Sequence, residues 1–350
     1  MQNQPLTVTL SVGQSKIGAG AIDTQGNIVC LLDEIATPPD WPSRYAASAQ
    51  QILAVIREVG IDHVIRAGVS FPEMMPPPSR LIANPETLPN THNPYHEGIE
   101  TLVHEALSQP LSVELLHDAA AAVLGEVSVK GSLPNCQDCV SIVWGTGVAS
   151  GVVSDGQLYW NDAEIALMTG EIGLQVMRQA DGSFVYRPAA DVPALNDGEY
   201  RLDRWLRGPA LAERFVGQVR EDERGSALLA KAAKTIDDLD LIDVNRAARQ
   251  GDAFAVELIA SAGNEMGRAL ARFVYYWLVE RKMTFARTIV IGSGVAKLGD
   301  GVTQAGSPVL ITAIRQALGD ALYGLGVDDY DVSKVCLSTI GYEREFYAFL

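Results

Sequence analysis

The stretch SIVWGTGVASGVVSDGQLYW, residues 141–160, decides the fold. An apolar strand runs into a Gly-Thr-Gly turn at 145–147, a second apolar strand follows, and an Asp-Gly turn at 155–156 leads into a third strand. Because glycine has no Cβ, the backbone of the first turn can approach a bound group closely, and successive N–H donors can face a phosphate. The stretch therefore predicts a hairpin unit that binds phosphate.

The same unit occurs near the N-terminus. Residues 6–10 read as a strand, 13–15 as a turn and 17–22 as a second strand, and a turn at 23–26 leads into 27–33. Two copies of one unit predict a duplicated nucleotide-binding architecture with a cleft between the halves. The length of 350 residues agrees, because roughly 100–200 residues per domain predicts about two domains.

Composition and charge limit the classes of partner and the location that the protein is expected to have. Hydrophobic residues make up 47% and charged residues 20% of the chain, as in an ordinary globular protein. The net charge of −16 disfavours nucleic acid and anionic membranes as partners. Residues 1–5 have no features of a signal peptide, and the apolar run around 270–279 is too short to cross a bilayer. We therefore expect a cytoplasmic protein.

Cys136 and Cys139 form a Cys-x-x-Cys pair in a loop. A zinc site would need a second pair, or two histidines at matching spacing, and the neighbouring sequence has neither. The pair is therefore interpreted as two thiols in a reducing compartment rather than as a metal or redox site.

Strands and helices alternate along the rest of the chain, which is typical of α/β proteins. The Pro- and Asn-rich stretch 71–94 reads as a long irregular loop, and loops of that length are usually functional. A strand over 112–116 leads into an alanine-rich helix over 119–126, with Asp118 where a helix N-cap would stand. The pattern also predicts a helix over 202–221.

Several motifs, in their order along the chain, make it similar to the ROK family of sugar kinases and repressors. LHDAAAAVLGE at 116–126 resembles the family's Asn-Asp-Ala-Asn-Ala-Ala-Ala-Leu-Gly-Glu run, and WGTGV at 144–148 resembles its Gly-Thr-Gly phosphate loop. GEIG at 170–173 resembles the run before its sugar-binding histidine. Further family-like runs stand at 208–211, 247–252 and 289–296.

The resemblance covers nearly the whole chain and implies an actin-like ATPase fold. This is an α/β fold in which two ribonuclease-H-like halves flank a cleft. We expect a small N-terminal α/β domain over 1–118, joined by a C-terminal helix over 341–350, and a larger α/β domain over 119–340. The family likeness also implies a homodimer.

The first phosphate loop departs from the family pattern. The family usually reads Asp-Ile-Gly-Gly-Thr-Lys, whereas this chain reads SVGQSK at 11–16. Ser11 replaces the aspartate that would help to hold the magnesium shell, and Gln14 replaces a glycine. These changes put catalysis in doubt while leaving the loop itself recognisable.

The sugar and zinc motifs depart as well. Leu174 stands where the family has its histidine. Residues 177–202 contain no cysteine and no histidine, and Asp203 replaces the glutamate that closes the family's zinc motif. We therefore predict that the protein binds no zinc and has no other metal site built from its own side chains.

The resemblance assigns the catalytic base to Asp118. Phosphoryl transfer needs positioned phosphates, neutralised charge and a base oriented on the attacking hydroxyl. A carboxylate would accept the sugar's proton as the hydroxyl attacks the γ-phosphoryl group. From the residue pattern alone a helix N-cap is the favoured role of Asp118, and both roles can hold at once.

Polar residues elsewhere are candidate sugar ligands. Glu171, inside the Gly-Glu-Ile-Gly run, would accept hydrogen bonds from sugar hydroxyls, or is an exposed loop carboxylate. The amides of Asn84, Asn90 and Asn93 match vicinal hydroxyls, although asparagine also suits turns. His117 is a further candidate.

The ATP and phosphate contacts are expected from the glycine turns and their neighbours. A glycine turn between strand and helix is common in α/β proteins, so the turn at 292–294 is a weak signal alone. Lys16 could pair with a phosphate or be an ordinary solvated lysine. The candidates are Gly13, Ser15, Lys16, Gly145, Thr146, Gly147, Gly292, Ser293 and Gly294.

Three functions compete. The favoured one is a cytoplasmic, ATP- and magnesium-dependent kinase of a hexose or hexose derivative. The alternative is a degenerate relative that binds a sugar or sugar phosphate without turnover, which the residues at 11, 14 and 174 favour. A repressor is disfavoured, because the first strand begins at about Leu6, before which there is no room for a DNA-binding domain, and because the chain is acidic.

Overall fold

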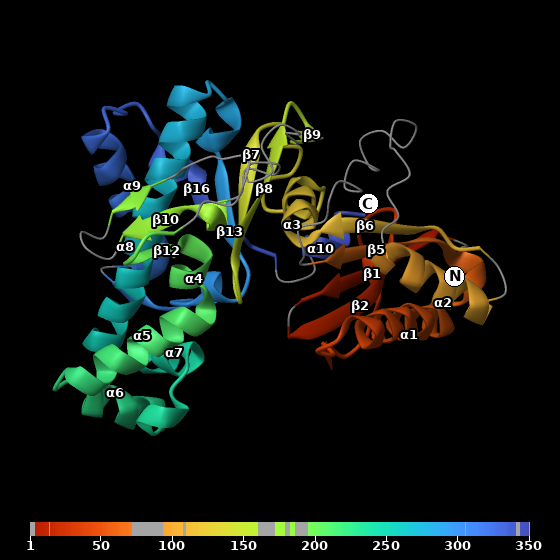
Figure 1. Cartoon of the computed structure of the whole chain (residues 1–350), viewed down its shortest axis with the longest axis horizontal. Helices are drawn as coiled ribbons and strands as arrows, with labels where there is room; N and C mark the ends of the chain where they lie inside the picture. The colour runs from red at the N-terminus through yellow and green to blue at the C-terminus, as the bar shows by residue number, and fades with distance from the viewer. Residues whose placement is uncertain are drawn as a thin grey trace. The chain divides into compact units, whose positions relative to one another are not determined.

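The computed structural model describes residues 4–13, 15–71, 94–107, 110–159, 172–178, 183–185, 195–304, 306–340 and 344–349 (Figure 1). The chain forms two compact units. The first comprises Met1–Gln137, Asp155–Leu158 and Thr339–Leu350, and the second comprises Asp138–Ser154 and Tyr159–Ser338. The domain boundary expected after residue 118 stays a prediction, because compactness alone does not identify independently folding segments. Within the described ranges, no helix has the length and apolarity needed to span a membrane.

The first unit is a mixed sheet covered by helices on both faces. Its strands are β1 Leu6–Val12, β2 Lys16–Asp23, β3 Ile28–Leu31, β4 Ile35–Ala36, β5 Val64–Phe71 and β6 Val113–His117. Its helices are α1 Trp41–Val59, α2 Pro94–Leu107, α3 Asp118–Val127 and α10 Arg344–Tyr347. The strand order is β3-β2-β1-β5-β6, with β4 paired to β2. β1 pairs antiparallel with β2, whereas β1, β5 and β6 run parallel.

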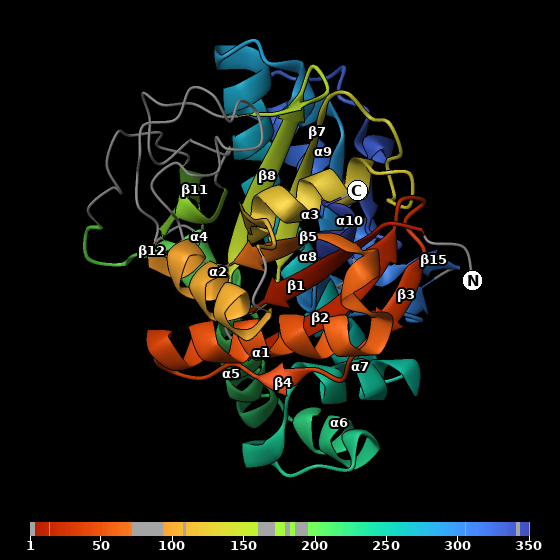
Figure 2. The ribbon, with the colours of Figure 1, turned by 90° about the vertical axis from the view of Figure 1, so that its right-hand side faces the viewer.

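Helices α1 and α2 lie on one face of this sheet, and α3 and α10 lie on the other (Figures 1 and 2). Coverage of both faces explains why β1, although it alternates apolar residues with Thr and Ser, is buried along nearly its whole length, as is the second half of β5. Helix α1 begins where Asp40 accepts a hydrogen bond from the Ser43 N–H at 2.9 Å, and Pro42 occupies its first turn. The helix ends at Gly60, whose φ of +85° suits glycine.

The end of the chain belongs to the core of the first unit. Phe346 and Phe349 are only 0% and 2% exposed. The Phe349 ring lies against Gly68 of β5, and the Arg66 guanidinium donates to the Phe349 carbonyl. Of the helix expected over 341–350, Arg344–Tyr347 is helical and residues 348–349 form a turn, whereas residues 341–343 and 350 lie outside the described ranges.

We expect Gly68→Ala to lower the free energy of unfolding by about 1–3 kcal/mol, the usual cost of overpacking a core. A Cβ at this position would overlap the ring of Phe349. Urea denaturation measures the change. In the Gly68→Ala background, Phe349→Leu should cost less than it does alone, because it removes the ring that clashes. Independent, additive effects of the two substitutions would contradict this packing.

The main sheet of the second unit repeats the first. Its strands are β7 Cys139–Trp144, β8 Val148–Ser154, β13 Ile289–Gly292 and β16 Val335–Leu337, and the short strand β9 Gln157–Leu158, whose residues are counted in the first unit, continues the same sheet. Their order is β16-β13-β7-β8-β9, which corresponds strand for strand to β6-β5-β1-β2-β3. β7 pairs antiparallel with β8 and parallel with β13, and β13 pairs parallel with β16. The duplication predicted from the two hairpin units is confirmed.

The rest of the second unit consists of helices and two small sheets. The helices are α4 Leu202–Leu206, α5 Gly208–Glu221, α6 Gly225–Ala232, α7 Leu241–Arg249, α8 Ala253–Val274 and α9 Val309–Gly324. The strands β10 Val176–Arg178, β11 Phe184–Val185 and β12 Glu199–Arg201 form one small sheet, and β14 Thr303–Gln304 and β15 Ser307–Pro308 form the other.

The single helix expected over 202–221 is wrong, because the chain breaks between α4 and α5. Arg207 has an extended backbone, with φ −58° and ψ 151°. Pro209 stands in the first turn of α5, a position that proline favours and that it could not take inside one continuous helix. The break lets the Gly208 N–H donate to the Gly145 carbonyl at 2.7 Å. It thus ties the start of α5 to the glycine turn after β7.

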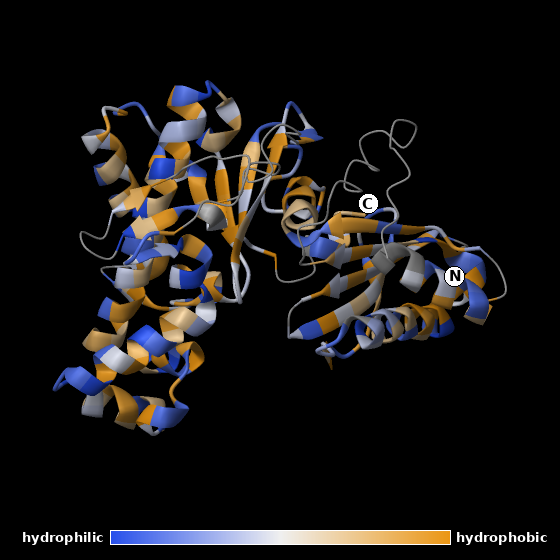
Figure 3. Cartoon of the chain, viewed as in Figure 1, coloured by the Kyte–Doolittle hydropathy of each residue, from blue (hydrophilic) through white to orange (hydrophobic). Residues whose placement is uncertain are grey.

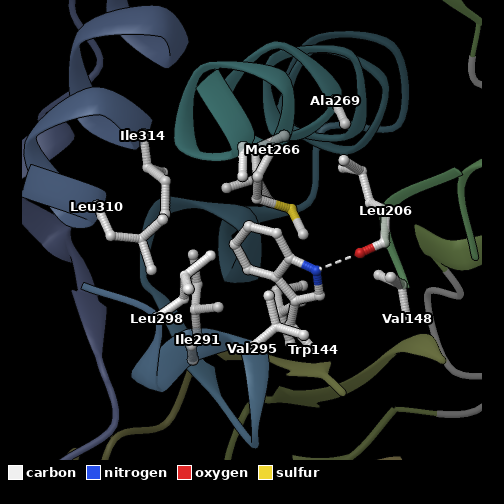
Figure 4. Close-up of a cluster of buried hydrophobic side chains, with 14 of the residues drawn as sticks. Trp144, Val148, Leu206, Met266, Ala269, Ile291, Val295, Leu298, Leu310 and Ile314 are labelled. Carbon is white, nitrogen blue, oxygen red and sulfur yellow. Dashed lines mark hydrogen bonds between the residues drawn. The ribbon is translucent and has the colours of Figure 1, made fainter. Parts of the chain in front are cut away.

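Trp144, the last residue of β7, anchors the core beneath that glycine turn (Figure 4). Its side chain is fully buried, and the indole N–H donates to the Leu206 carbonyl at 2.7 Å. The strands of both sheets are largely hydrophobic (Figure 3). The side chains around the indole come mainly from α8, β13 and α9, and include Met266, Ile291, Val295, Leu298, Leu310 and Ile314.

Candidate functional site

The two glycine turns predicted for ATP lie side by side in the second unit. Residues 145–147 follow β7, and 292–294 include the end of the neighbouring strand β13, where Gly292 pairs with Val143. A Cβ on Gly145 would lie 2.8 Å from the Ser293 Oγ. Ser293 has a φ of +87°, an uncommon conformation for a residue other than glycine. The structure therefore brings both turns together, although the sequence separates them widely.

Hydrogen bonds hold the first turn in place. The Gly145 N–H donates to the Gly147 carbonyl at 2.9 Å, which closes the turn on itself. The Gly145 carbonyl accepts from Gly208, and Trp144 is held from below by its bond to Leu206. A turn fixed in this way can present backbone N–H groups to an anion without a large ordering cost.

The outer side of both turns has space. A Cβ built on Gly147 or on Gly294 would meet no atom within 4 Å. Neither glycine has the positive φ that would itself demand glycine. Packing against the described residues therefore does not explain these two glycines, whereas close approach of a bound group would.

In the first unit, the parallel strands bring polar side chains to one edge of the sheet. Ser11 of β1 is paired in register with Ser70 of β5, and Ser70 is paired with Leu116 of β6. Asp118 follows the end of β6. The carboxyl ends of parallel strands are the usual place for a ligand in α/β sheets.

Asp118 is not the helix cap, contrary to the role favoured by the residue pattern. His117 has the non-helical backbone of the cap, and its Nδ1 accepts from the Ala119 N–H at 3.3 Å. Asp118 is therefore the first residue inside α3. The helix starts one residue earlier than expected because a histidine ring nitrogen, rather than the carboxylate, accepts the hydrogen bond at the first turn.

The carboxylate of Asp118 is left with an unused acceptor. Its Oδ1 is buried and makes no hydrogen bond with the described residues, and the His117 Nδ1 lies 3.4 Å away. Since that nitrogen accepts from the Ala119 N–H, it has no proton to donate to Asp118, and we do not treat the two residues as an ion pair. A buried acceptor without a partner is costly, and a ligand hydroxyl would satisfy it.

A carboxylate that sequence reasoning missed lies at the same strand ends. The Oε2 atom of Glu345, in α10, accepts hydrogen bonds from the Ser11 hydroxyl at 2.5 Å and from the Ser70 hydroxyl at 2.7 Å. Ser11 and Glu345 are 334 positions apart in the chain. A single glutamate in the last residues carries no local pattern that would have identified it.

Hydrogen bonds fix the turn that begins at Gly13, and Lys16 forms an ion pair with Glu34. The Gly13 N–H donates to the Lys16 carbonyl at 2.8 Å, and Thr37 bonds to the carbonyls of Gly13 and Ser15. The Lys16 ammonium is exposed and lies 2.7 Å from a Glu34 carboxylate oxygen. This hydrogen bond and charge raise the pKa of Lys16 above its ordinary value. A phosphate contact by Lys16 stays a prediction.

Asp203 is a second buried carboxylate with an unused acceptor, in the second unit. Its Oδ1 is buried and accepts no hydrogen bond from the part of the chain that the structure describes. Burial raises the pKa of Asp203 above its ordinary value, although the nearby positive charges of Arg204, Arg201 and Arg207 oppose that rise. The sequence identified this position as a replaced family glutamate, but not as a site residue.

The remaining candidate sugar ligands Glu171, Asn84, Asn90 and Asn93 lie outside the described residues. The expected absence of zinc also stays a prediction, because part of 177–202 lies outside them.

The fold family implies a magnesium ion, and the strand ends of the first unit fit one. In the described ranges no three metal-ligating side chains come together. Magnesium in kinases, however, is held by one or two carboxylates together with phosphate oxygens and water. Asp118, with its buried unused oxygen, and Glu345 are carboxylates of this kind.

Comparison with known proteins gives consistent matches. The ROK family model matches residues 7–180. The glucokinase of Streptomyces coelicolor is 24% identical over 300 residues, which are 84% of each chain. A ROK family glucokinase from Streptomyces griseus, solved with glucose and AMPPNP, has a TM-score of 0.69 at 20% identity and covers 98% of this chain and 97% of its own.

The ROK hexokinase of Thermus thermophilus has a TM-score of 0.60 at 20% identity, covering 98% of this chain and 96% of its own. These likenesses confirm the expected actin-like ATPase fold.

Proposed function

We propose that the chain is a member of the ROK family, whose model matches residues 7–180, and that it is an ATP-dependent kinase of a hexose or hexose derivative, with Asp118 as the general base. The observation that carries this proposal is the buried, unused Oδ1 of Asp118 beside the ends of the parallel strands. Support comes from the S. coelicolor glucokinase, to which the chain is similar, and from the S. griseus structure with glucose and AMPPNP.

Each group has a separate task in this proposal. Backbone N–H groups of the turns at 145–147 and 292–294 bind the nucleotide, where the missing Cβ atoms of Gly147 and Gly294 leave room. Asp118 accepts the proton of the attacking sugar hydroxyl. Bound magnesium supplies positive charge that offsets the phosphate oxygens. Asp203, whose buried oxygen lacks a partner, is a candidate acceptor for a second sugar hydroxyl.

A degenerate sugar-binding protein is the second candidate. The altered first loop favours it, since the Ser11 hydroxyl is engaged by Glu345 and cannot act as the family's aspartate. In either case, a cytoplasmic location, a homodimer and the absence of nucleic-acid partners stay predictions.

A coupled assay of ADP release tests the two candidates directly. Hexoses, amino sugars and N-acetylated hexosamines are offered with magnesium ATP, and binding of the same sugars is measured by calorimetry. ADP release that depends on one sugar class supports the kinase and identifies its substrate. Sugar binding without ADP release supports the degenerate candidate.

We expect Gly147→Ala to weaken ATP binding by roughly 10-fold or more, equivalent to about 1.4 kcal/mol, while leaving stability nearly unchanged. The added methyl group meets no atom of the described residues within 4 Å, so the expected obstruction is of the bound nucleotide. Calorimetric titration with AMPPNP and thermal unfolding measure the two effects.

Gly217→Ala is the matched control, because a Cβ there also meets no atom within 4 Å and the residue lies inside α5. This variant should gain up to about 1 kcal/mol of stability, since alanine is the better helix former, and should bind AMPPNP normally. If Gly147→Ala binds AMPPNP as tightly as wild type does, the turn at 145–147 does not contact the nucleotide.

A further inference from the structure

Two serine hydroxyls at the end of the first sheet converge on one carboxylate. Ser11 and Ser70, on adjacent parallel strands, both donate to Oε2 of Glu345, at 2.5 and 2.7 Å. Hydrogen bonds to an ionised acceptor are stronger than those between neutral groups. The two bonds therefore fix a carboxylate group at the carboxyl end of β1.

Position 11 is where the chain departs from the family's aspartate. With a serine there, the side chain donates a hydrogen bond instead of carrying a charge. An aspartate at position 11 would bring a second carboxylate against that of Glu345, and two carboxylates sharing one place repel each other. Ser11 and Glu345 are therefore complementary as hydrogen-bond donor and acceptor. The carboxylate at the end of β1 is supplied by Glu345 instead of by residue 11.

The segment that carries Glu345 is firmly anchored. Phe346, the next residue, is fully buried, and a Cβ on Gly20 would lie 3.1 Å from its ring. Phe349 packs on β5, and its carbonyl accepts from Arg66. These two buried rings, which follow Glu345, fix the glutamate before any ligand arrives, which lowers the cost of binding an ion.

We propose that Glu345 supplies, from the C-terminal helix, the carboxylate that orients and balances the hydrated magnesium ion of the nucleotide, in place of an aspartate at position 11. The proposal rests on the kinase function proposed above. It makes Glu345 a positioning residue for the ion, and it makes Ser11 and Ser70 its supports.

Calorimetric titration with ADP, with and without Mg²⁺, tests this role apart from turnover. In wild type, Mg²⁺ should strengthen ADP binding. Glu345→Gln keeps the shape and a hydrogen-bond acceptor but removes the charge. It should lower the affinity for Mg-ADP by roughly 10- to 100-fold, the usual effect of losing a group that orients a metal shell. The affinity for ADP without Mg²⁺ should not fall.

Glu58→Gln is the matched control for net charge, because Glu58 is an exposed residue of α1 in the same unit. It should bind Mg-ADP as wild type does. Thermal unfolding of each variant identifies any that is misfolded.

A pair of substitutions that transfers the carboxylate from position 345 to position 11 gives a second, independent test. Ser11→Asp alone should lower the melting temperature, because it places two carboxylates together. The double variant Ser11→Asp with Glu345→Gln should recover both the melting temperature and the Mg²⁺ dependence of ADP binding. Recovery of both supports the proposal, whereas a double variant no better than Ser11→Asp overturns it.

The outcomes separate this proposal from the kinase function. If wild type releases ADP with a sugar but Glu345→Gln keeps the full effect of Mg²⁺ on ADP binding, the role of Glu345 is wrong and the kinase stands. If no sugar causes ADP release while Glu345→Gln abolishes the Mg²⁺ effect, the kinase is wrong and the role of Glu345 stands. If the wild-type protein binds ADP equally well with and without Mg²⁺, the proposed role of Glu345 is wrong.

Discussion

Asp118→Asn should lower turnover by roughly 10²- to 10⁴-fold, the usual contribution of general-base catalysis. The amide keeps the shape of the carboxylate but cannot take up the proton of the sugar hydroxyl. Steady-state ADP release, measured with the best sugar from the screen, gives the change. The affinity for the sugar should change much less, because the amide oxygen still accepts a hydrogen bond.

Stability distinguishes a base from a merely structural carboxylate. His117, not Asp118, caps α3, so the substitution should cost little beyond the weak attraction of a carboxylate to the helix N-terminus, about 0.3–1 kcal/mol. His117→Ala, which removes the cap acceptor, should cost about 1 kcal/mol. Normal turnover in Asp118→Asn would show that the base is another group, even though the family assignment stands.

Trp144→Ala should lower the free energy of unfolding by about 3–5 kcal/mol, the usual range for removing a large aromatic side chain from a core. The side chain is 0% exposed, and its loss also leaves the Leu206 carbonyl without its partner. Denaturant unfolding monitored by circular dichroism gives the change. Because Trp144 directly precedes the turn at 145–147, the variant should also bind AMPPNP less tightly.

Replacing tryptophan by phenylalanine separates the contribution of ring packing to stability from that of the indole hydrogen bond. Trp144→Phe keeps most of the ring but loses the bond to Leu206, which should cost about 1–3 kcal/mol for the unpaired carbonyl in addition to the lost volume. Trp277 is the matched control, since it is also fully buried but its indole N–H makes no hydrogen bond within the described ranges. Trp277→Phe should therefore cost less. Equal losses in the two variants would mean that the bond to Leu206 contributes nothing.

Local chemistry explains the parts of the fold that could be predicted from sequence. The two hairpin units were recognisable because glycine turns and continuous apolar strands leave a short-range pattern. Their duplication predicted a repeated architecture, and the two main sheets share one strand order. Asp118 and the turns at 145–147 and 292–294 were found in the same way, through short motifs that resemble a family.

The local structure differs from the sequence prediction where side-chain capping or a contact with a residue distant in sequence determines it. The helix expected over 202–221 breaks where Gly208 reaches Gly145, and α3 starts one residue early because the ring of His117 can act as its cap. After Arg344–Tyr347, residues 348–349 form a turn in which the ring of Phe349 lies against β5.

The sequence by itself determined the fold class, the two repeated units and the candidate base, because strand, turn and motif patterns depend on residues close together in the chain. Only the tertiary structure decided that the two glycine turns of the second unit adjoin, and that Glu345 meets Ser11 and Ser70. Those contacts join residues that are far apart in sequence. They form because parallel strands align their ends and because burial of Phe346 and Phe349 carries the glutamate to that edge.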